Sequence, residues 1–186
     1  GSGDKTAILW DLASGEKVRT FAGHTGPLNS AALSPDGRHV LTGSWDKAVL
    51  WDAATGKQVR TAQAEEAIGC VAFSPDGRRA IMCGVFLKPF IWDVVSGEET
   101  PPFEQGAWVA GFSPDGRHLF LGSSREGALC DAATGAVIRR FAGRVRPLES
   151  LAVSPDGRQV VCGESHHYTN VWDTTTGAIA RVLAGG

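Results

Sequence analysis

The chain has 186 residues, of which 42% are hydrophobic and 20% are charged, and its formal net charge is −2. This composition excludes an intrinsically disordered chain and gives no overall basic field that would attract nucleic acid. No stretch approaches the roughly 20 consecutive apolar residues that span a bilayer. We therefore expect a soluble, cytoplasmic protein with neither nucleic acid nor a membrane as its partner.

Short motifs recur along the chain at intervals of about forty residues, which indicates a repeat architecture. The tetrapeptide Ser-Pro-Asp-Gly begins at Ser34, Ser74, Ser113 and Ser154. A Trp-Asp pair recurs in step with it, and Cys130 replaces the Trp in the fourth of its five positions. Each of these pairs is followed by Ser-Gly or Thr-Gly. The Trp residues of the pairs are Trp10, Trp51, Trp92 and Trp172.

The segments between these motifs are short runs of β-favouring residues, too short for helices and typical of strands. In the repeat that begins at Gly23 we expect four strands, named a to d, over 28–33, 39–42, 48–51 and 58–62. Ser-Pro-Asp-Gly predicts the turn between a and b, because Pro presets φ and Gly accepts a positive φ. The later Ser-Gly or Thr-Gly predicts the turn between c and d in the same way.

Four antiparallel strands per repeat, with Trp-Asp closing the third strand, resemble the WD-repeat β-propeller family. The resemblance implies an all-β chain of four-stranded antiparallel blades. It divides the chain into a half-blade over 1–22 and four full repeats over 23–63, 64–102, 103–142 and 143–186. Because strands a and b of the half-blade are absent, we expect an open fragment of a larger ring whose remaining blades are missing. Ring closure by oligomerisation is the alternative.

The first full repeat carries the family's fingerprint most completely. The resemblance implies that His24, Thr42, Asp46 and Trp51 form a hydrogen-bonded structural tetrad, with Ser44 as the fallback hydroxyl. Cys130 removes a large aromatic side chain from the third full repeat, so we expect the weakest blade there unless another group refills the space.

We expect the chain to be a protein-interaction scaffold that binds a protein or peptide partner and needs no cofactor. Antiparallel strands bring the b-to-c and d-to-a loops to one face, which this family commonly uses for partners. Exposed aromatic and arginine side chains are frequent binding hot spots. The alternative is a sensor or substrate-docking propeller of a larger enzyme, such as a kinase or protease, whose catalytic domain lies outside this chain. The predicted partner-binding residues are Trp45, Phe86, Leu87, Lys88, Arg125, Arg144, Arg146, His166, His167 and Tyr168.

We expect no catalytic or metal site in this chain. The repeated Asp residues of the Ser-Pro-Asp-Gly turns suit turn geometry better than a carboxylate cluster. His166 and His167 near Glu164 could ligate zinc or copper, but adjacent His side chains point apart in an extended chain, which favours an ordinary polar loop. Cys83 and Cys162 are interpreted as equivalent, unreactive core positions late in strand b.

Overall fold

The computed structural model describes residues 1–124, 126–141, 148–164 and 168–184. These residues form five antiparallel sheets joined by turns and loops. No helix in the described part of the chain is long and apolar enough to cross a membrane.

The strands are grouped by blade. The half-blade contains β1 (Thr6–Trp10) and β2 (Lys17–Ala22). Blade 1 contains β3 (Ser30–Leu33), β4 (His39–Gly43), β5 (Lys47–Asp52) and β6 (Gln58–Gln63). Blade 2 contains β7 (Cys70–Phe73), β8 (Arg79–Cys83) and β9 (Phe90–Asp93). Blade 3 contains β10 (Val109–Phe112), β11 (His118–Gly122), β12 (Gly127–Asp131) and β13 (Val137–Phe141); blade 4 contains β14 (Leu148–Val153), β15 (Gln159–Glu164), β16 (Tyr168–Asp173) and β17 (Ile179–Ala184).

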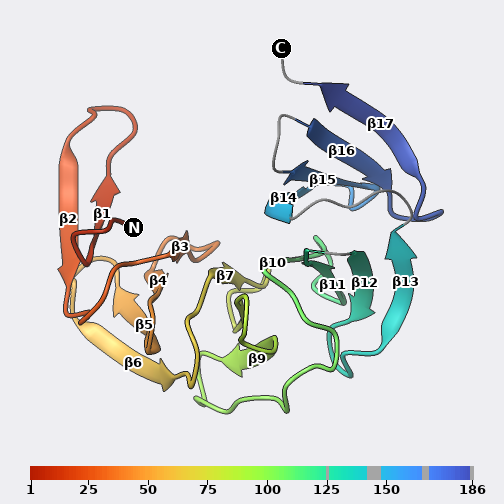
Figure 1. Ribbon diagram of the computed structural model, residues 1–186. Coiled ribbons are helices and arrows are strands. Elements are labelled where there is room, and N and C mark those ends of the chain that lie inside the picture. Colours follow the sequence, from red (N-terminus) through yellow and green to blue (C-terminus); the bar gives the residue numbers. More distant parts are fainter. Residues whose placement is uncertain (125, 142–147, 165–167, 185–186) are drawn as a thin grey trace.

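The sheets follow one another around an arc, as Figure 1 shows, with the first strand of each full blade on the inside. These inner strands contact one another from blade to blade, so that β3 meets β7, β7 meets β10, and β10 meets β14. The arc is open between the half-blade and blade 4 (Figure 1). The expected all-β architecture of an open propeller is therefore confirmed.

The two predicted kinds of turn are present and use glycine as expected. Gly37, in the turn from β3 to β4, has a φ of 71°, and Gly56, in the turn from β5 to β6, has a φ of 74°. An L side chain is strained in this left-handed region, whereas glycine enters it freely. The equivalent glycines of the other repeats have the same sign of φ, so the repeated motifs fold into repeated hairpins.

Blade 2 differs from the prediction because it has three strands instead of four. The segment that would form the outer strand makes a single bridge, between Trp92 and Glu99. Pro101 and Pro102 follow at once. Proline has no N–H to donate to a sheet, so two consecutive prolines prevent the pairing from extending beyond this bridge.

The exposed edge of β9 is nevertheless covered by this irregular segment. Thr100 donates its N–H to the carbonyl of Ile91 at 2.8 Å, and its Oγ1 accepts the N–H of Ile91 at 2.9 Å. Phe103 then donates its N–H to the carbonyl of Pro89 at 2.7 Å. Because these backbone groups have partners, β9 does not offer an open edge for pairing with another strand.

Phe103 also occupies the space beside Cys130, where the repeat pattern has lost its tryptophan. Its side chain is 5% exposed and belongs to the same apolar cluster as Cys130 and Ala132. The ring lies against Gly135, where an added Cβ would meet Phe103 Cδ1 at 2.5 Å. In blades 1 and 4 the tryptophans Trp51 and Trp172 are themselves buried. Phe103 thus packs in the apolar cluster around Cys130, as Phe21 and Phe141 pack against Trp51 and Trp172.

Candidate partner-binding face

A buried chain of hydrogen bonds supports the loops of blade 1. Trp51 donates its indole N–H to Thr42 Oγ1 at 2.7 Å, and His24 Nε2 lies 2.7 Å from the same oxygen. Asp46 accepts a hydrogen bond from Thr25 Oγ1 at 3.2 Å, whereas His24 Nδ1 has no partner. Three of the four predicted tetrad members are therefore linked directly through Thr42, and Asp46 is not hydrogen-bonded to His24.

The environment of His24 favours the neutral imidazole. Burial, with a smaller contribution from the Lys47 ammonium, lowers the pKa of His24 below its ordinary value, and the carboxylate of Asp46 opposes the shift. The Thr42 hydroxyl donates to Val49 O at 3.3 Å, so a neutral imidazole with its proton on Nε2 can donate to Thr42 Oγ1. The group thus has a structural role beneath the loop between β4 and β5.

Three successive loops form one continuous surface at the end of blades 1 and 2. The loop before β7 is attached to the loop between β4 and β5, because Ala64 N–H donates to Asp46 O and Ile68 N–H donates to Ser44 O, each at 2.9 Å. It is also attached to blade 2, because Gly69 N–H donates to Cys83 O at 2.9 Å. Rigid strands therefore hold the loops 44–46, 64–69 and 84–88 side by side.

Two large aromatic side chains are exposed on this surface. The side chain of Trp45 is 64% exposed and that of Phe86 is 81% exposed. Glu65 and Glu66 belong to the loop 64–69, which is the middle one of the three loops. Both side chains are exposed. We call the surface formed by Trp45, Glu65, Glu66, Phe86 and Leu87 the acidic loop face.

A hollow of about 600 Å³ adjoins Phe86 in this face. It lies between the loop 64–66 and the loop 86–88, so the structure brings together the predicted residues Phe86, Leu87 and Lys88. It is also lined by Phe90 and by Glu99, Thr100 and Pro102 of the irregular segment after β9. The volume is that of a typical small binding pocket.

The charge of the acidic loop face is uneven. Glu65, Glu66 and Glu99 all line the hollow, whereas Lys88 is the single cationic residue among its described lining residues and lies 3.5 Å from Glu104 through its Nζ. The carboxylates are therefore in excess beside exposed apolar side chains. Such a surface suits a cationic group next to an apolar one.

Trp45 lines a separate hollow of about 360 Å³, together with Lys5, Gly26 and Pro27. The indole packs close to Gly26, where an added Cβ would lie 3.6 Å from Trp45 Cγ. One edge of the ring thus rests on the loop before β3 while most of it remains open. Trp45 and Phe86 are consequently two anchors on one face instead of two walls of one pocket.

Several predicted site residues lie outside the described part of the chain. These are Arg125, Arg144, Arg146, His166 and His167, and the side chain of Tyr168 is also outside it. The hypothetical metal site of His166 and His167 therefore also lies outside the described residues. Within the described residues, no group of three or more His, Cys, Asp or Glu side chains is arranged to hold a metal ion.

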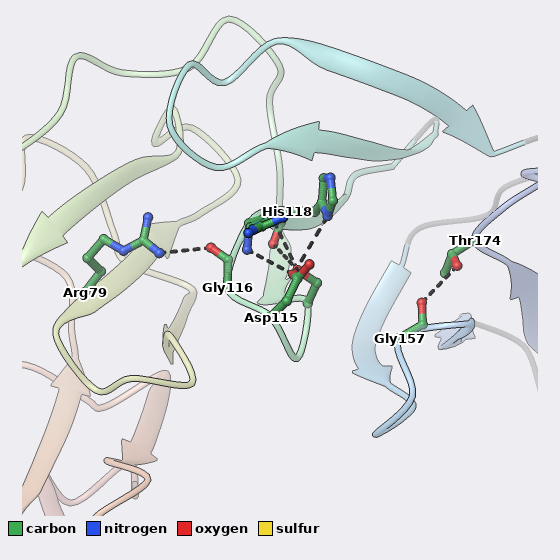
Figure 2. A network of polar contacts seen from close by, with 8 residues as sticks. Arg79, Asp115, Gly116, His118, Gly157 and Thr174 are labelled. Atoms are coloured by element: carbon green, nitrogen blue, oxygen red, sulfur yellow. Dashed lines mark hydrogen bonds and ion pairs between the residues drawn. The ribbon is translucent and has the colours of Figure 1, made fainter.

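The opposite rim is formed by the turns, and its carboxylates are used to cap them. Asp115 accepts hydrogen bonds from Ser113 Oγ and from the N–H of Arg117. Figure 2 shows several contacts that converge on the Asp115 carboxylate. These bonds, the one from Ser113 first, lower the pKa of Asp115. Arg79 crosses from blade 2 and donates to Gly116 O at 2.9 Å (Figure 2). His118 also lies 3.9 Å from Asp115 through its Nδ1, and the contacts of Asp115 stabilise its own turn.

The interpretation of Cys83 and Cys162 as equivalent positions is wrong. Cys83 lies six residues after Gly77 of its turn, whereas Cys162 lies five residues after Gly157. Because side chains alternate along a strand, this difference of one residue turns the two thiols to opposite faces of their sheets. Cys83 instead lies opposite Cys70 in the register of β7 and β8. Counting from the turn glycine would have found this pair.

Comparison with known proteins supports the repeat assignment. The family described as WD domain, G-beta repeat matches residues 15–52, from the turn of the half-blade to the end of β5. A guanine nucleotide-binding protein subunit beta-1 from Caenorhabditis briggsae is 46% identical over 43 residues, which are 23% of this chain and 13% of that protein. The chain therefore spans a small part of the length of this curated relative.

Proposed function

We propose that this chain, in which residues 15–52 match the WD-repeat family, is an interaction scaffold whose acidic loop face binds a protein segment carrying a basic side chain next to an apolar one. The observation that carries the proposal is the exposure of two aromatic anchors, Trp45 and Phe86, on loops joined by the loop of Glu65 and Glu66, which is hydrogen-bonded to the Trp45 loop and lines the same hollow as Phe86. The protein would act by recognition without chemistry.

The energetics of such a face favour a small number of contacts. Burial of an exposed Trp or Phe removes a large apolar area from water at a low cost in side-chain entropy. The carboxylates add attraction and discrimination, since a partner with an acidic segment would be repelled. Because backbone hydrogen bonds fix the three loops to each other and to the strands, we expect little rearrangement on binding.

A random peptide library displayed on phage tests the proposal without assuming any particular partner. We expect selection on the immobilised chain to enrich sequences with Lys or Arg next to an aromatic or aliphatic residue. Kd of the best synthetic peptide would then be measured by fluorescence anisotropy for the wild type and for variants. Enrichment of acidic sequences would contradict the proposed chemistry.

Matched variants separate loss of the site from loss of the fold. We expect Trp45→Ala and Phe86→Ala each to weaken binding by about tenfold or more. Glu65→Lys with Glu66→Lys should weaken binding most at low salt, because added salt screens the carboxylates of the wild type. Trp10→Ala is the control, since Trp10 is 53% exposed but lies at the turn end of β1. Equal binding by all of these variants would refute the assignment of the face.

A further inference from the structure

Two thiols face each other inside blade 2. Cys70 in β7 and Cys83 in β8 are register partners in an antiparallel pair. Directly opposite residues of such a pair have Cα atoms about 4.5–5.5 Å apart, which falls within the range of about 4.4–6.8 Å in which disulfides form. Their side chains project to the same face of the sheet. The backbone of the folded protein therefore already provides the spacing of a cross-strand disulfide.

Blades 3 and 4 support the direction of these side chains. The position of Cys83 is glycine in blades 1, 3 and 4. A Cβ added to Gly163 would lie 2.6 Å from Ser150 Oγ, and one added to Gly122 would lie 2.9 Å from Val109 Cγ2. Ser150 and Val109 are the counterparts of Cys70, so this inner-strand side chain points at the position opposite. Of the four full blades, as far as they are described, blade 2 alone has a side chain at both positions.

The two thiols differ in access and in acidity. Cys70 is partly exposed on the innermost strand of its blade, with its Sγ 3.7 Å from Ala110 O, whereas Cys83 is fully buried. The hydrogen bond from the Cys83 thiol lowers the pKa of Cys70 to about 7. The same contact, together with burial, raises the pKa of Cys83. Cys70 is thus the accessible nucleophile and Cys83 the protonated neighbour.

We propose that Cys70 and Cys83 are a peroxide-reactive dithiol that closes to a disulfide between β7 and β8. The Cys70 thiolate attacks one oxygen of hydrogen peroxide, the O–O bond breaks, hydroxide leaves, and Cys70 becomes a sulfenic acid. The sulfur of Cys83 then attacks the sulfur of Cys70. The S–S bond forms as the S–O bond breaks, and the sulfenic hydroxyl leaves with the Cys83 proton as water. Two electrons pass from the thiols to the peroxide.

Peptide mapping of the folded wild-type chain tests this reaction. After treatment with hydrogen peroxide, free thiols are alkylated under denaturing conditions and the chain is cut with trypsin. Cys70 then lies in the peptide 61–78 and Cys83 in the peptide 80–117, because the bond from Lys88 to Pro89 resists cleavage. We expect these two peptides to be joined, with the loss of two hydrogen atoms. Cys130 and Cys162 should remain alkylated in the peptides 126–139 and 159–181.

The sister blades supply the variants least harmful to folding. Cys70→Ser introduces the residue of Ser30 and Ser150, and Cys83→Gly introduces the glycine of the other blades. We expect Cys83→Gly to accumulate a sulfenic acid at Cys70 that dimedone traps, and Cys70→Ser to leave Cys83 reduced. Cys130→Ser is the matched control and should form the disulfide as fast as the wild type.

Several results would overturn the assignment. One is that the folded wild type keeps all four thiols after peroxide treatment. A second is that the linked peptides include Cys130 or Cys162, or that Cys70 passes to sulfinic acid without joining Cys83. Oxidation of Cys83 in Cys70→Ser at the wild-type rate would refute the division of roles. Because the decisive map is made on the wild type, loss of folding in a variant leaves the test intact.

Discussion

Thr42 Oγ1 accepts the indole N–H of Trp51 at 2.7 Å and lies at the same distance from His24 Nε2. The hydroxyl group of Thr42 in β4 thus connects the indole of Trp51 in β5 to His24 in the loop before β3. All three side chains are buried. Removal of this hydroxyl would leave two ring nitrogens without partners inside the protein, which is more costly than the loss of one surface hydrogen bond.

Thr42→Val should therefore destabilise the protein while preserving the shape of the side chain. We expect the free energy of unfolding to fall by about 1–3 kcal/mol, the cost of leaving buried polar groups unsatisfied. Urea unfolding followed by tryptophan fluorescence measures the change. Thr61→Val is the matched control, because Thr61 is exposed on β6 of the same blade, and a loss as large as that of Thr42→Val would contradict the argument.

The neutral state of His24 predicts a pH dependence. Burial lowers the pKa of His24 below the ordinary value of 6.5. Folding therefore favours the deprotonated form, and the unfolded chain binds more protons between the two pKa values. The contribution of His24 is complete above pH 6.5 and is lost as the pH falls through the folded-state pKa.

Unfolding free energies measured from about pH 7.5 to about pH 5.5 would reveal this effect. The turn carboxylates titrate at lower pH, because their hydrogen bonds lower the pKa values of groups such as Asp36 and Asp52. We expect His24→Gln to be less stable at the upper pH but to lose less stability on acidification. An unchanged slope in His24→Gln would show that another group is responsible.

Phe103 should be a major stabilising residue of blade 3. It packs in one apolar cluster with Cys130 and is 5% exposed, so Phe103→Ala should cost about 3–5 kcal/mol through the cavity that it leaves. Phe86→Ala is the matched control, because Phe86 is 81% exposed and its loss should change stability by about 0.5 kcal/mol or less. Similar losses in both variants, measured by urea unfolding, would contradict the assigned role of Phe103.

Arg79 should contribute to the junction between blades 2 and 3. Its guanidinium donates to Gly116 O at 2.9 Å and lies 5.5 Å from the centroid of the Phe112 ring. We expect Arg79→Ala to lower the free energy of unfolding by about 1–2 kcal/mol. The neighbouring Arg78→Ala removes an exposed arginine from the same turn and should have little effect. Equal effects would show that Arg79 acts only through its charge.

The architecture was predictable because the turn chemistry repeats. Ser-Pro-Asp-Gly and the Ser-Gly or Thr-Gly turns fix the hairpins locally, and the positive φ values of Gly37 and Gly56 follow from that chemistry. Pro101 and Pro102 indicate that blade 2 lacks its outer strand. The regular spacing of the Ser-Pro-Asp-Gly and Trp-Asp motifs nevertheless favoured four strands in every repeat. The burial of Phe103 could have been predicted from the same period, because Phe103 lies eleven residues after Trp92 just as the buried Phe21 and Phe141 lie eleven residues after Trp10 and Cys130.

The candidate site was less predictable than the fold for a physical reason. Loop residue types indicated Trp45 and Phe86 as binding residues, but the attachment of the loop 64–69 to both neighbouring loops arises from backbone hydrogen bonds that no motif encodes. The Cys70–Cys83 pair depends on strand register, in which an error of one residue reverses the face of a side chain. Register therefore decides which of these side chains meet.

The acidic loop face is the central claim, and hydrogen exchange of the chain with and without a selected peptide tests it most directly. We predict that the peptide slows amide exchange in the loops 44–46, 64–69 and 84–88 and leaves the Ser-Pro-Asp-Gly turns unchanged. Protection confined to those turns, for example at 34–37 and 74–77, would contradict the account and move the binding site to the opposite rim.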